Sequence, residues 1–130
     1  RTKFEEVLRT SDYISLHCPL NDATSRIINA DTLALMKQDA FLINTARGGL
    51  VDPYDLVSCL QAGNIAGAAI DVLEQEPPTL DDPLLKDIPN LIVTPHNAWA
   101  AIESRNRLIQ QSRENIEGFL KGKPVRLVTQ

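Results

Sequence analysis

The sequence predicts an α/β fold: a parallel β-sheet of the doubly wound kind, with helices on both faces. Three observations lead to this prediction. Short apolar runs alternate along the 130 residues with segments whose apolar positions recur at helical spacing. The loops between them are short, and the run at residues 65–70 is apolar nearly throughout, as in a strand that is covered on both faces. Strands that alternate with helices in this way pair in parallel.

The first 44 residues predict two helices and two strands. Residues 4–8 have the spacing of a short amphipathic helix, and residues 13–19 form an extended run. A brief helix follows, which either Asn29 or Asp31 can cap, because a side-chain oxygen at that position satisfies free backbone amides. Residues 40–44 lead into a turn of small residues and form the second predicted strand.

The next predicted helix has the clearest boundaries in the sequence. Asp52 has the side chain of an N-cap, and Pro53 suits the first helical position, where its missing amide proton costs nothing. Gly63 suits the left-handed conformation in which many helices end. The stripe that faces the core is expected to consist of Leu56, Val57 and Leu60.

The rest of the chain predicts two more strands and one long helix. Residues 65–71 and 90–94 form the third and fourth strands, separated by a loop rich in Pro and Asp at residues 74–83. Apolar residues fall near a helical period from about residue 98 to residue 120. The tail at residues 125–128 is expected to be extended.

The composition argues against several classes of partner. The net charge is −4 and there is no run of basic residues, which disfavours binding to nucleic acid or to an anionic membrane. No apolar stretch has the length of a membrane span. Cys18 and Cys59 are the only cysteines and do not make a disulfide framework, so a cytoplasmic setting is expected. The two histidines lie far apart and no Cys-x-x-Cys occurs, so no metal site is predicted.

Three predicted strand ends carry charged side chains that could share one site, because ligands of open α/β sheets bind beyond the carboxyl ends of the strands. Arg47 follows the second strand, and its planar guanidinium can hold a carboxylate with two hydrogen bonds. The adjacent Gly48 and Gly49 would let a ligand approach the backbone closely. The alternative is that Arg47 is a surface arginine or forms a structural ion pair.

The other two strand ends supply an acid–base group and several carboxylates. His96 follows the fourth strand and is either a proton donor or a structural histidine. Asp71 ends the third strand, and Glu74 and Glu76 follow it. A carboxylate beside an imidazole fixes its tautomer and favours its protonated form, but spacing alone does not choose between Glu74 and Glu76. His17 has no evident partner in the sequence and is expected to be a packing or backbone-bonded histidine.

Three segments, in this order, resemble the D-isomer-specific 2-hydroxyacid dehydrogenases. They are Asn-Thr-Ala-Arg-Gly-Gly at residues 44–49, Gly-Ala-Ala-Ile-Asp-Val at residues 67–72 with Glu76-Pro77, and Thr-Pro-His at residues 94–96. The resemblance extends over essentially the whole chain. Within the family, residues 71–78 and 96–99 look most like the glycerate dehydrogenases, which are also called hydroxypyruvate reductases.

The resemblance implies a role for each strand-end residue. Arg47 would bind the carboxylate of a 2-oxo acid and polarise its carbonyl group. His96 would deliver a proton to the carbonyl oxygen while a nicotinamide delivers hydride to the carbon. Glu76, rather than Glu74, matches the family's third catalytic position, where it hydrogen-bonds His96 and keeps it protonated. Asp71 matches the residue that holds the nicotinamide carboxamide.

The cofactor implied by the resemblance is NAD or NADP, with NAD favoured. The residues expected to contact it are Cys18, Pro19, Thr24, Thr45, Ala46, Arg47, Asp71, His96 and Ala98. The substrate would be a small 2-oxo or 2-hydroxy acid such as hydroxypyruvate or glyoxylate. The full-length protein would be a homodimer.

One part of the family's pattern is absent from these 130 residues. Neither Gly-x-Gly-x-x-Gly nor a Lys-containing phosphate loop occurs, so either the chain binds no nucleotide or the phosphate-binding half precedes Arg1. Given the resemblance, we expect a partial Rossmann-like sheet that lacks its first βαβ half. Residues 1–123 would form the carboxyl-terminal part of the nucleotide-binding domain, and residues 124–130 a tail that returns toward the substrate domain. Such a fragment is expected to be inactive by itself.

Two other functions are open at this stage. Relatives of this fold serve as dinucleotide-sensing corepressors, so the chain could be a binding module without catalysis. It could instead be a non-catalytic dimerisation fragment, with Trp99 and the long last helix at the interface. The presence of Arg47, Glu76 and His96 favours the dehydrogenase over a pure sensor.

Overall fold

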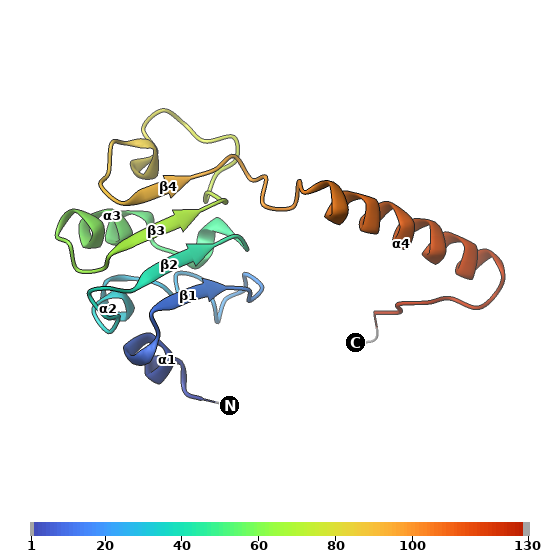
Figure 1. The fold of residues 1–130 in the computed structure, drawn as a ribbon, viewed down its shortest axis with the longest axis horizontal. Coiled ribbons are helices and arrows are strands. Elements are labelled where there is room, and N and C mark those ends of the chain that lie inside the picture. Colours follow the sequence, from blue (N-terminus) through green and yellow to red (C-terminus); the bar gives the residue numbers. More distant parts are fainter. Residues whose placement is uncertain (1, 129–130) are drawn as a thin grey trace. The chain divides into compact units, whose positions relative to one another are not determined.

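The computed structural model describes residues 2–128, which form two compact units (Figure 1). The first unit ends at His96 and the second begins at Asn97. In the first unit the elements are α1 (Phe4–Thr10), β1 (Tyr13–Leu16), α2 (Ala30–Leu33), β2 (Phe41–Asn44), the 3₁₀ turn η1 (Gly48–Leu50), α3 (Pro53–Gln61), β3 (Gly67–Ile70), the 3₁₀ turn η2 (Pro83–Leu85) and β4 (Leu91–Val93). The second unit contains α4 (Ile102–Leu120).

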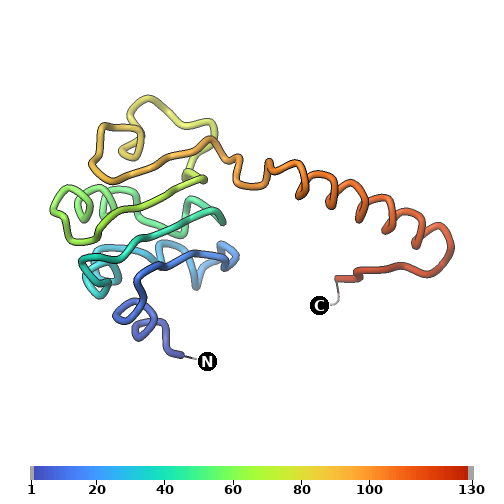
Figure 2. Tube along the Cα trace, viewed as in Figure 1, coloured from blue at the N-terminus to red at the C-terminus, as the bar shows by residue number. Residues whose placement is uncertain are grey.

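The four strands form one parallel sheet in the order β1-β2-β3-β4. The colours in Figure 2 accordingly change from blue to orange strand by strand across the sheet. Asn44 pairs with Ile70, and Ile70 pairs with Val93, so β2, β3 and β4 end at the same level. The segments that follow these strands therefore leave from one edge of the sheet. The predicted α/β class with a parallel sheet is confirmed.

The strands are shorter than the sequence predicts. The β1 strand ends at Leu16 rather than at residue 19, and β3 begins at Gly67 rather than at residue 65. A strand extends only as far as its neighbour pairs with it, and β1 pairs with β2 over four positions, from Tyr13 to Leu16. Pairing with a distant segment is not encoded in the local apolar pattern, so the pattern overestimates the strand lengths.

One face of the sheet packs against the helices of the first unit. Ile14, Leu42 and Ile70 point to this face and are at most 5% exposed. The helices and loops over it contribute further buried side chains: Leu8, Ile28, Leu33, Leu50, Leu56 and Leu60. Burial of each such side chain contributes about 1.5–3 kcal/mol, and a slip of one residue would move a whole strand's apolar set to the wrong face. This core therefore fixes the register of the strand ends.

The opposite face of the sheet is exposed within the first unit. Tyr13 is 70% and Ile92 64% exposed on this face, and the ring of Tyr13 stacks on that of Phe41 at a centroid distance of 5.6 Å. Helices on both faces were expected. Successive parallel strands with right-handed connections place every connection on the same side, so an order of β1-β2-β3-β4 covers one face only.

The predicted cap and end residues of α2 and α3 agree with the structure, whereas α1 runs to Thr10, two residues beyond the predicted segment. Asn29, rather than Asp31, caps α2, because its side chain accepts a hydrogen bond from the Thr32 amide. The Asp52 side chain caps α3, and Gly63 adopts φ +67° just beyond the end of that helix. The core-facing stripe of α3 differs from the expectation at one position, since the buried residues include Leu56, Cys59 and Leu60, whereas Val57 is half-buried.

The second unit is dominated by the 19-residue helix α4. It begins at Ile102 rather than near residue 98, because a turn closed by the Ala100 amide and the Asn97 carbonyl precedes it. None of the 19 described residues of α4 is buried, and its apolar residues, Ile109 among them, are exposed. Residues 125–128 form no strand in the described part of the tail. Across residues 2–128, every helix is too short or too polar to cross a membrane.

Candidate active site

Glu76 and His96 form the centre of the site. Glu76 Oε2 lies 2.6 Å from His96 Nδ1, and Glu76 Oε1 accepts a hydrogen bond from the Leu73 amide at 2.9 Å. The ring of His96 and, secondly, the Leu73 amide stabilise the ionised carboxyl and hold the pKa of Glu76 below its ordinary value. An ionised carboxylate can only accept hydrogen bonds, so Nδ1 of His96 carries a proton.

The backbone directs His96 toward Glu76. His96 adopts φ +51°, in the left-handed region that few non-glycine residues enter. Its amide donates to the Thr94 carbonyl at 3.0 Å, which closes a tight turn around Pro95. Left-handed backbone at a non-glycine residue is concentrated at functional positions, and here it occurs at the residue whose ring contacts Glu76.

Asp71 provides a buried carboxylate at the end of β3. It is 4% exposed, and the Thr94 hydroxyl donates to its Oδ1 at 2.5 Å. Burial of a carboxylate without hydrogen bonds is costly, so this partner matters. Sequence reasoning missed the role of Thr94, because only the pairing of β3 with β4 places residue 94 beside residue 71.

A cavity of about 450 Å³ lies beside these residues. Its walls consist of Asp71, Leu73, Glu76, Pro77, Pro78, Leu85, Val93, Thr94, Pro95 and His96. Most of this lining is apolar, and the polar groups are the two carboxylates, the imidazole and the hydroxyl. Such a pocket, with a few convergent polar groups in apolar surroundings, is typical of small-molecule sites. The structure thus brings Asp71, Glu76 and His96 to one cavity.

Arg47 lies in the turn at residues 45–49, which follows β2 and is called the Arg47 turn below. Its guanidinium Nη1 donates to the Ala46 carbonyl at 2.6 Å, so the side chain is turned toward its own backbone. The fully buried amide of Asn44 holds the turn, since it donates to the Arg47 carbonyl at 2.9 Å and accepts from the Ala46 amide at 3.1 Å. The Arg47 side chain itself is exposed and accessible to an anion.

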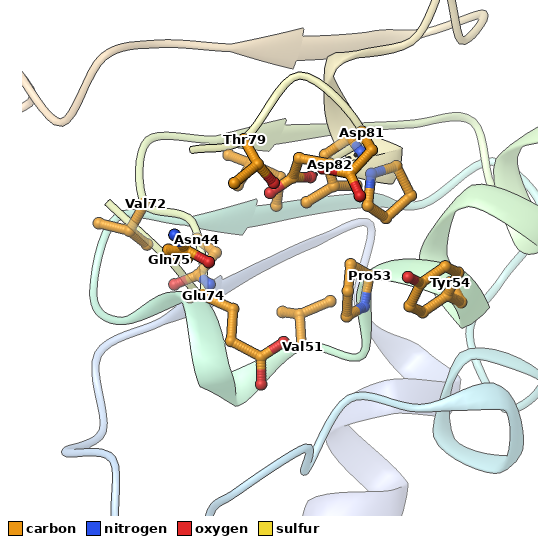
Figure 3. A pocket seen from close by; sticks show the side chains of 14 residues that line it. Asn44, Val51, Pro53, Tyr54, Val72, Glu74, Gln75, Thr79, Asp81 and Asp82 are labelled. Atoms are coloured by element: carbon orange, nitrogen blue, oxygen red, sulfur yellow. Dashed lines mark hydrogen bonds between the residues drawn. The ribbon is translucent and has the colours of Figure 1, made fainter. Parts of the chain in front are cut away.

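Glu74 faces a different part of the surface from Glu76. Figure 3 shows it at a second cavity of about 250 Å³, with Gln75 on the same side and Pro53 and Tyr54 on the other. Its Oε1 lies 3.5 Å from the guanidinium of Arg26. The choice that spacing left open is therefore decided by geometry, since the structure places Glu76 and not Glu74 beside the imidazole.

Comparison with known proteins identifies the family. Residues 1–98 match the family model described as the D-isomer specific 2-hydroxyacid dehydrogenase, NAD binding domain. This chain belongs to that family. It is 50% identical over 125 residues to the glycerate dehydrogenase of Methylorubrum extorquens, covering 95% of the chain and 40% of that relative. It is 44% identical over 126 residues to the hydroxypyruvate reductase of Blautia hydrogenotrophica, covering 97% of the chain and 39% of that relative.

A solved structure has a similar fold. An acyclic imino acid reductase in complex with NADPH and D-Arg superimposes with a TM-score of 0.87 at 39% sequence identity. The match covers 98% of this chain and 40% of that protein. The predicted family and the Rossmann-like fold class are therefore confirmed. This chain spans about 40% of the length of the relatives it matches.

The residues that the family resemblance assigns to the dinucleotide lie at several places along the chain. The half-buried Cys18 follows β1, and the Thr24 hydroxyl donates to the Pro19 carbonyl at 2.6 Å, which closes the next loop. Thr45 and Ala46 belong to the Arg47 turn. Ala98 lies in the second unit and is exposed. Contact of these residues with the cofactor stays a prediction.

The prediction for His17 was wrong. The residue is exposed, and its Nε2 lies 2.8 Å from the hydroxyl of Ser15. Side chains two positions apart along extended backbone point to the same face, which explains the pairing. This spacing was visible in the sequence and could have identified Ser15 as the partner.

Proposed function

We propose that this chain is part of an NAD(P)-dependent D-2-hydroxyacid dehydrogenase that reduces a small 2-oxo acid. Residues 1–123 would form the carboxyl-terminal part of its nucleotide-binding domain, and residues 124–130 the tail toward the substrate domain. The names of the relatives point to hydroxypyruvate as a substrate, with glyoxylate as a second candidate. The observation that carries the proposal is the 2.6 Å contact between Glu76 and His96 at the wall of a pocket.

His96 acts as the proton donor. Because Nδ1 faces the Glu76 carboxylate, Nε2 is the ring nitrogen that transfers a proton to the substrate's carbonyl oxygen. Glu76 stays ionised during the reaction, since its pKa is held below the ordinary value, and it stabilises the imidazolium before the transfer. In the oxidation of a 2-hydroxy acid, the neutral ring takes the proton back.

Arg47 binds the carboxylate of the substrate. The guanidinium exchanges its hydrogen bond to the Ala46 carbonyl for two hydrogen bonds to the substrate carboxylate. Its positive charge also stabilises the negative charge that develops on the carbonyl oxygen. The buried Asn44 keeps the turn in place while the side chain moves.

The residues present fit a nicotinamide cofactor. Asp71 presents a buried carboxylate at the pocket, which is an acceptor for the carboxamide of the nicotinamide ring. The cofactor, when bound, supplies the hydride that reduces the carbonyl carbon. We favour NAD over NADP, because the family model is that of an NAD binding domain. We further propose a cytoplasmic homodimer for the full-length protein.

The test is reduction of 2-oxo acids by the full-length protein that contains this sequence. NADH and NADPH oxidation would be followed with hydroxypyruvate, glyoxylate and phosphohydroxypyruvate. We expect turnover with at least one of them, and we expect His96→Gln to lower kcat by a factor of about 10²–10⁴, the usual contribution of a positioned acid. Binding of NADH, measured by its fluorescence, should be retained in this variant.

Two outcomes would contradict the proposal. Turnover by His96→Gln at the wild-type rate would remove His96 from the mechanism. Binding of NADH without turnover of any of the three acids by the wild-type protein would favour a dinucleotide-sensing module.

A further inference from the structure

We propose that Gly48 and Arg26 are positioning residues that hold the loop at residues 71–76 against the Arg47 turn. They would thereby keep Glu76 in place beside His96. This inference rests on the proposed function for the meaning of Glu76, but its structural part can be tested without any activity.

The strongest observation is the contact that Gly48 makes. A Cβ atom at this position would lie 2.1 Å from the carbonyl carbon of Leu73, 2.2 Å from its oxygen and 2.4 Å from the nitrogen of Glu74. All three are backbone atoms, so they cannot turn aside as the end of a side chain could. Glycine at position 48 therefore lets the Arg47 turn lie directly on the Leu73–Glu74 peptide.

The carbonyl group of this peptide belongs to Leu73, the same residue whose amide holds Glu76. The amide of Leu73 donates to Glu76 Oε1 at 2.9 Å, while Oε2 of the same carboxylate contacts His96. A methyl group at position 48 would push the peptide away from the turn and with it the amide that holds Glu76. The contact at Gly48 thus links the turn that carries Arg47 to the carboxylate that orients His96.

Arg26 also connects the Arg47 turn to the loop at residues 71–76. Its amide donates to the Gly49 carbonyl at 2.8 Å, and its backbone has φ +48°. The guanidinium binds Asp52 Oδ2 at 3.0 Å and reaches Glu74 Oε1 at 3.5 Å. Arg26 and Glu74 are each about half exposed, and exposed ion pairs contribute little, so we expect Arg26 to have a smaller effect than Gly48.

The neighbouring glycine provides a matched control. A Cβ atom at Gly49 would come no closer than 3.0 Å, to Cδ2 of Leu20, which is the end of a flexible and exposed side chain. Gly49→Ala therefore adds the same methyl group one residue away, without the backbone collision.

The first experiment compares Gly48→Ala with Gly49→Ala in the full-length protein labelled with ¹⁵N-leucine. In the wild type, the amide resonance of Leu73 should shift with pH as Glu76 titrates, because the amide donates to that carboxylate. Gly48→Ala should abolish this dependence and Gly49→Ala should retain it. An unchanged pH dependence in Gly48→Ala would overturn the inference, whether or not the protein is a dehydrogenase.

The second experiment measures kcat with hydroxypyruvate and NADH. Gly48→Ala should lower kcat about tenfold to a hundredfold, as expected for the loss of a hydrogen bond to a charged group. Arg26→Ala should lower it about two- to fivefold, with partial recovery in Arg26→Lys. If Gly48 acts through Glu76, the double variant Gly48→Ala/Glu76→Gln should be no slower than Glu76→Gln.

Additive losses in that double variant would show a general structural role and would overturn the positioning role. If Gly48→Ala does not fold, Arg26→Ala and its lysine counterpart decide the question, since Arg26 lies at the surface. A full rate in Arg26→Ala would then contradict the inference. Absence of any turnover by the wild type would refute the proposed function. The pH dependence of the Leu73 amide resonance would still test whether Gly48 positions Glu76.

Discussion

Both carboxylate oxygens of Glu76 accept a hydrogen bond, one from His96 Nδ1 and one from the Leu73 amide. Each donor favours the ionised carboxylate, and the ring of His96 makes the larger contribution to lowering its pKa. Replacement of His96 by Ala should therefore raise the pKa of Glu76 toward its ordinary value of 4.5, which ¹³C NMR of the side-chain carboxyl can measure. Glu76 has a side-chain exposure of 36%, so the effect on overall stability should be small.

The sign of the pH effect follows from the lowered pKa. A carboxyl whose pKa is lower in the folded state contributes stability above pH 4.5, and this contribution is lost as the pH falls through the folded-state pKa. Between pH 6 and pH 3, the wild type should lose more stability than His96→Ala in urea unfolding. Equal losses in the two proteins would show that the His96–Glu76 pair makes no contribution to folding.

At the scale of single elements, the start of α3 links helix capping to the site. Asp52 Oδ1 accepts from the amides of Tyr54 and Asp55 at 3.0 and 3.2 Å, and Oδ2 binds Arg26. Asp52→Ala removes all of these interactions and should lower the free energy of unfolding by about 1 kcal/mol or somewhat more. Asp52→Asn keeps a good cap and should lose only the ion pair. Urea denaturation of both variants is the measurement, and equal losses would contradict the capping role.

The helices could be predicted better than the strands, and the reason is physical. Caps such as Asn29 and Asp52 act on amides within three residues, so the sequence nearby contains all the information. The end of β1 depends on pairing with β2, some 28 residues further along, and the late start of α4 depends on a turn at Asn97. Such distant pairing and irregular backbone leave no periodic signal.

The candidate site shows the same division. Its residue types and the edge of the sheet were predictable, because parallel strands end together and Arg47, Asp71 and His96 each follow a strand. The hydrogen bond from Thr94 to Asp71 and the contact of Gly48 with the loop after β3 could not be predicted, because they arise from strand register and backbone packing. These contacts are the ones that orient the site.

At the scale of the whole molecule, the exposed face of the sheet is the feature that most needs explanation. Doubly wound sheets have both faces covered, and this chain spans about 40% of its relatives, so we expect other parts of the full-length protein to pack on this face. Tyr13, which is 70% exposed on this face, and Tyr54, which is 67% exposed on α3, are the only tyrosines and form a matched pair for a test.

Tyr13→Lys should lower the stability of the 130-residue chain by only about 1 kcal/mol, through the loss of the stacking on Phe41. In the full-length protein the same change should bury an unpaired ammonium group and destabilise by several kcal/mol, about 3 or more. Tyr54→Lys should have little effect in either protein. The measurement is the midpoint of urea denaturation of the wild type, Tyr13→Lys and Tyr54→Lys, each as the 130-residue chain and as the full-length protein. An equally small effect of Tyr13→Lys in both lengths would show that this face stays in contact with water, and that the sheet is not doubly wound around it.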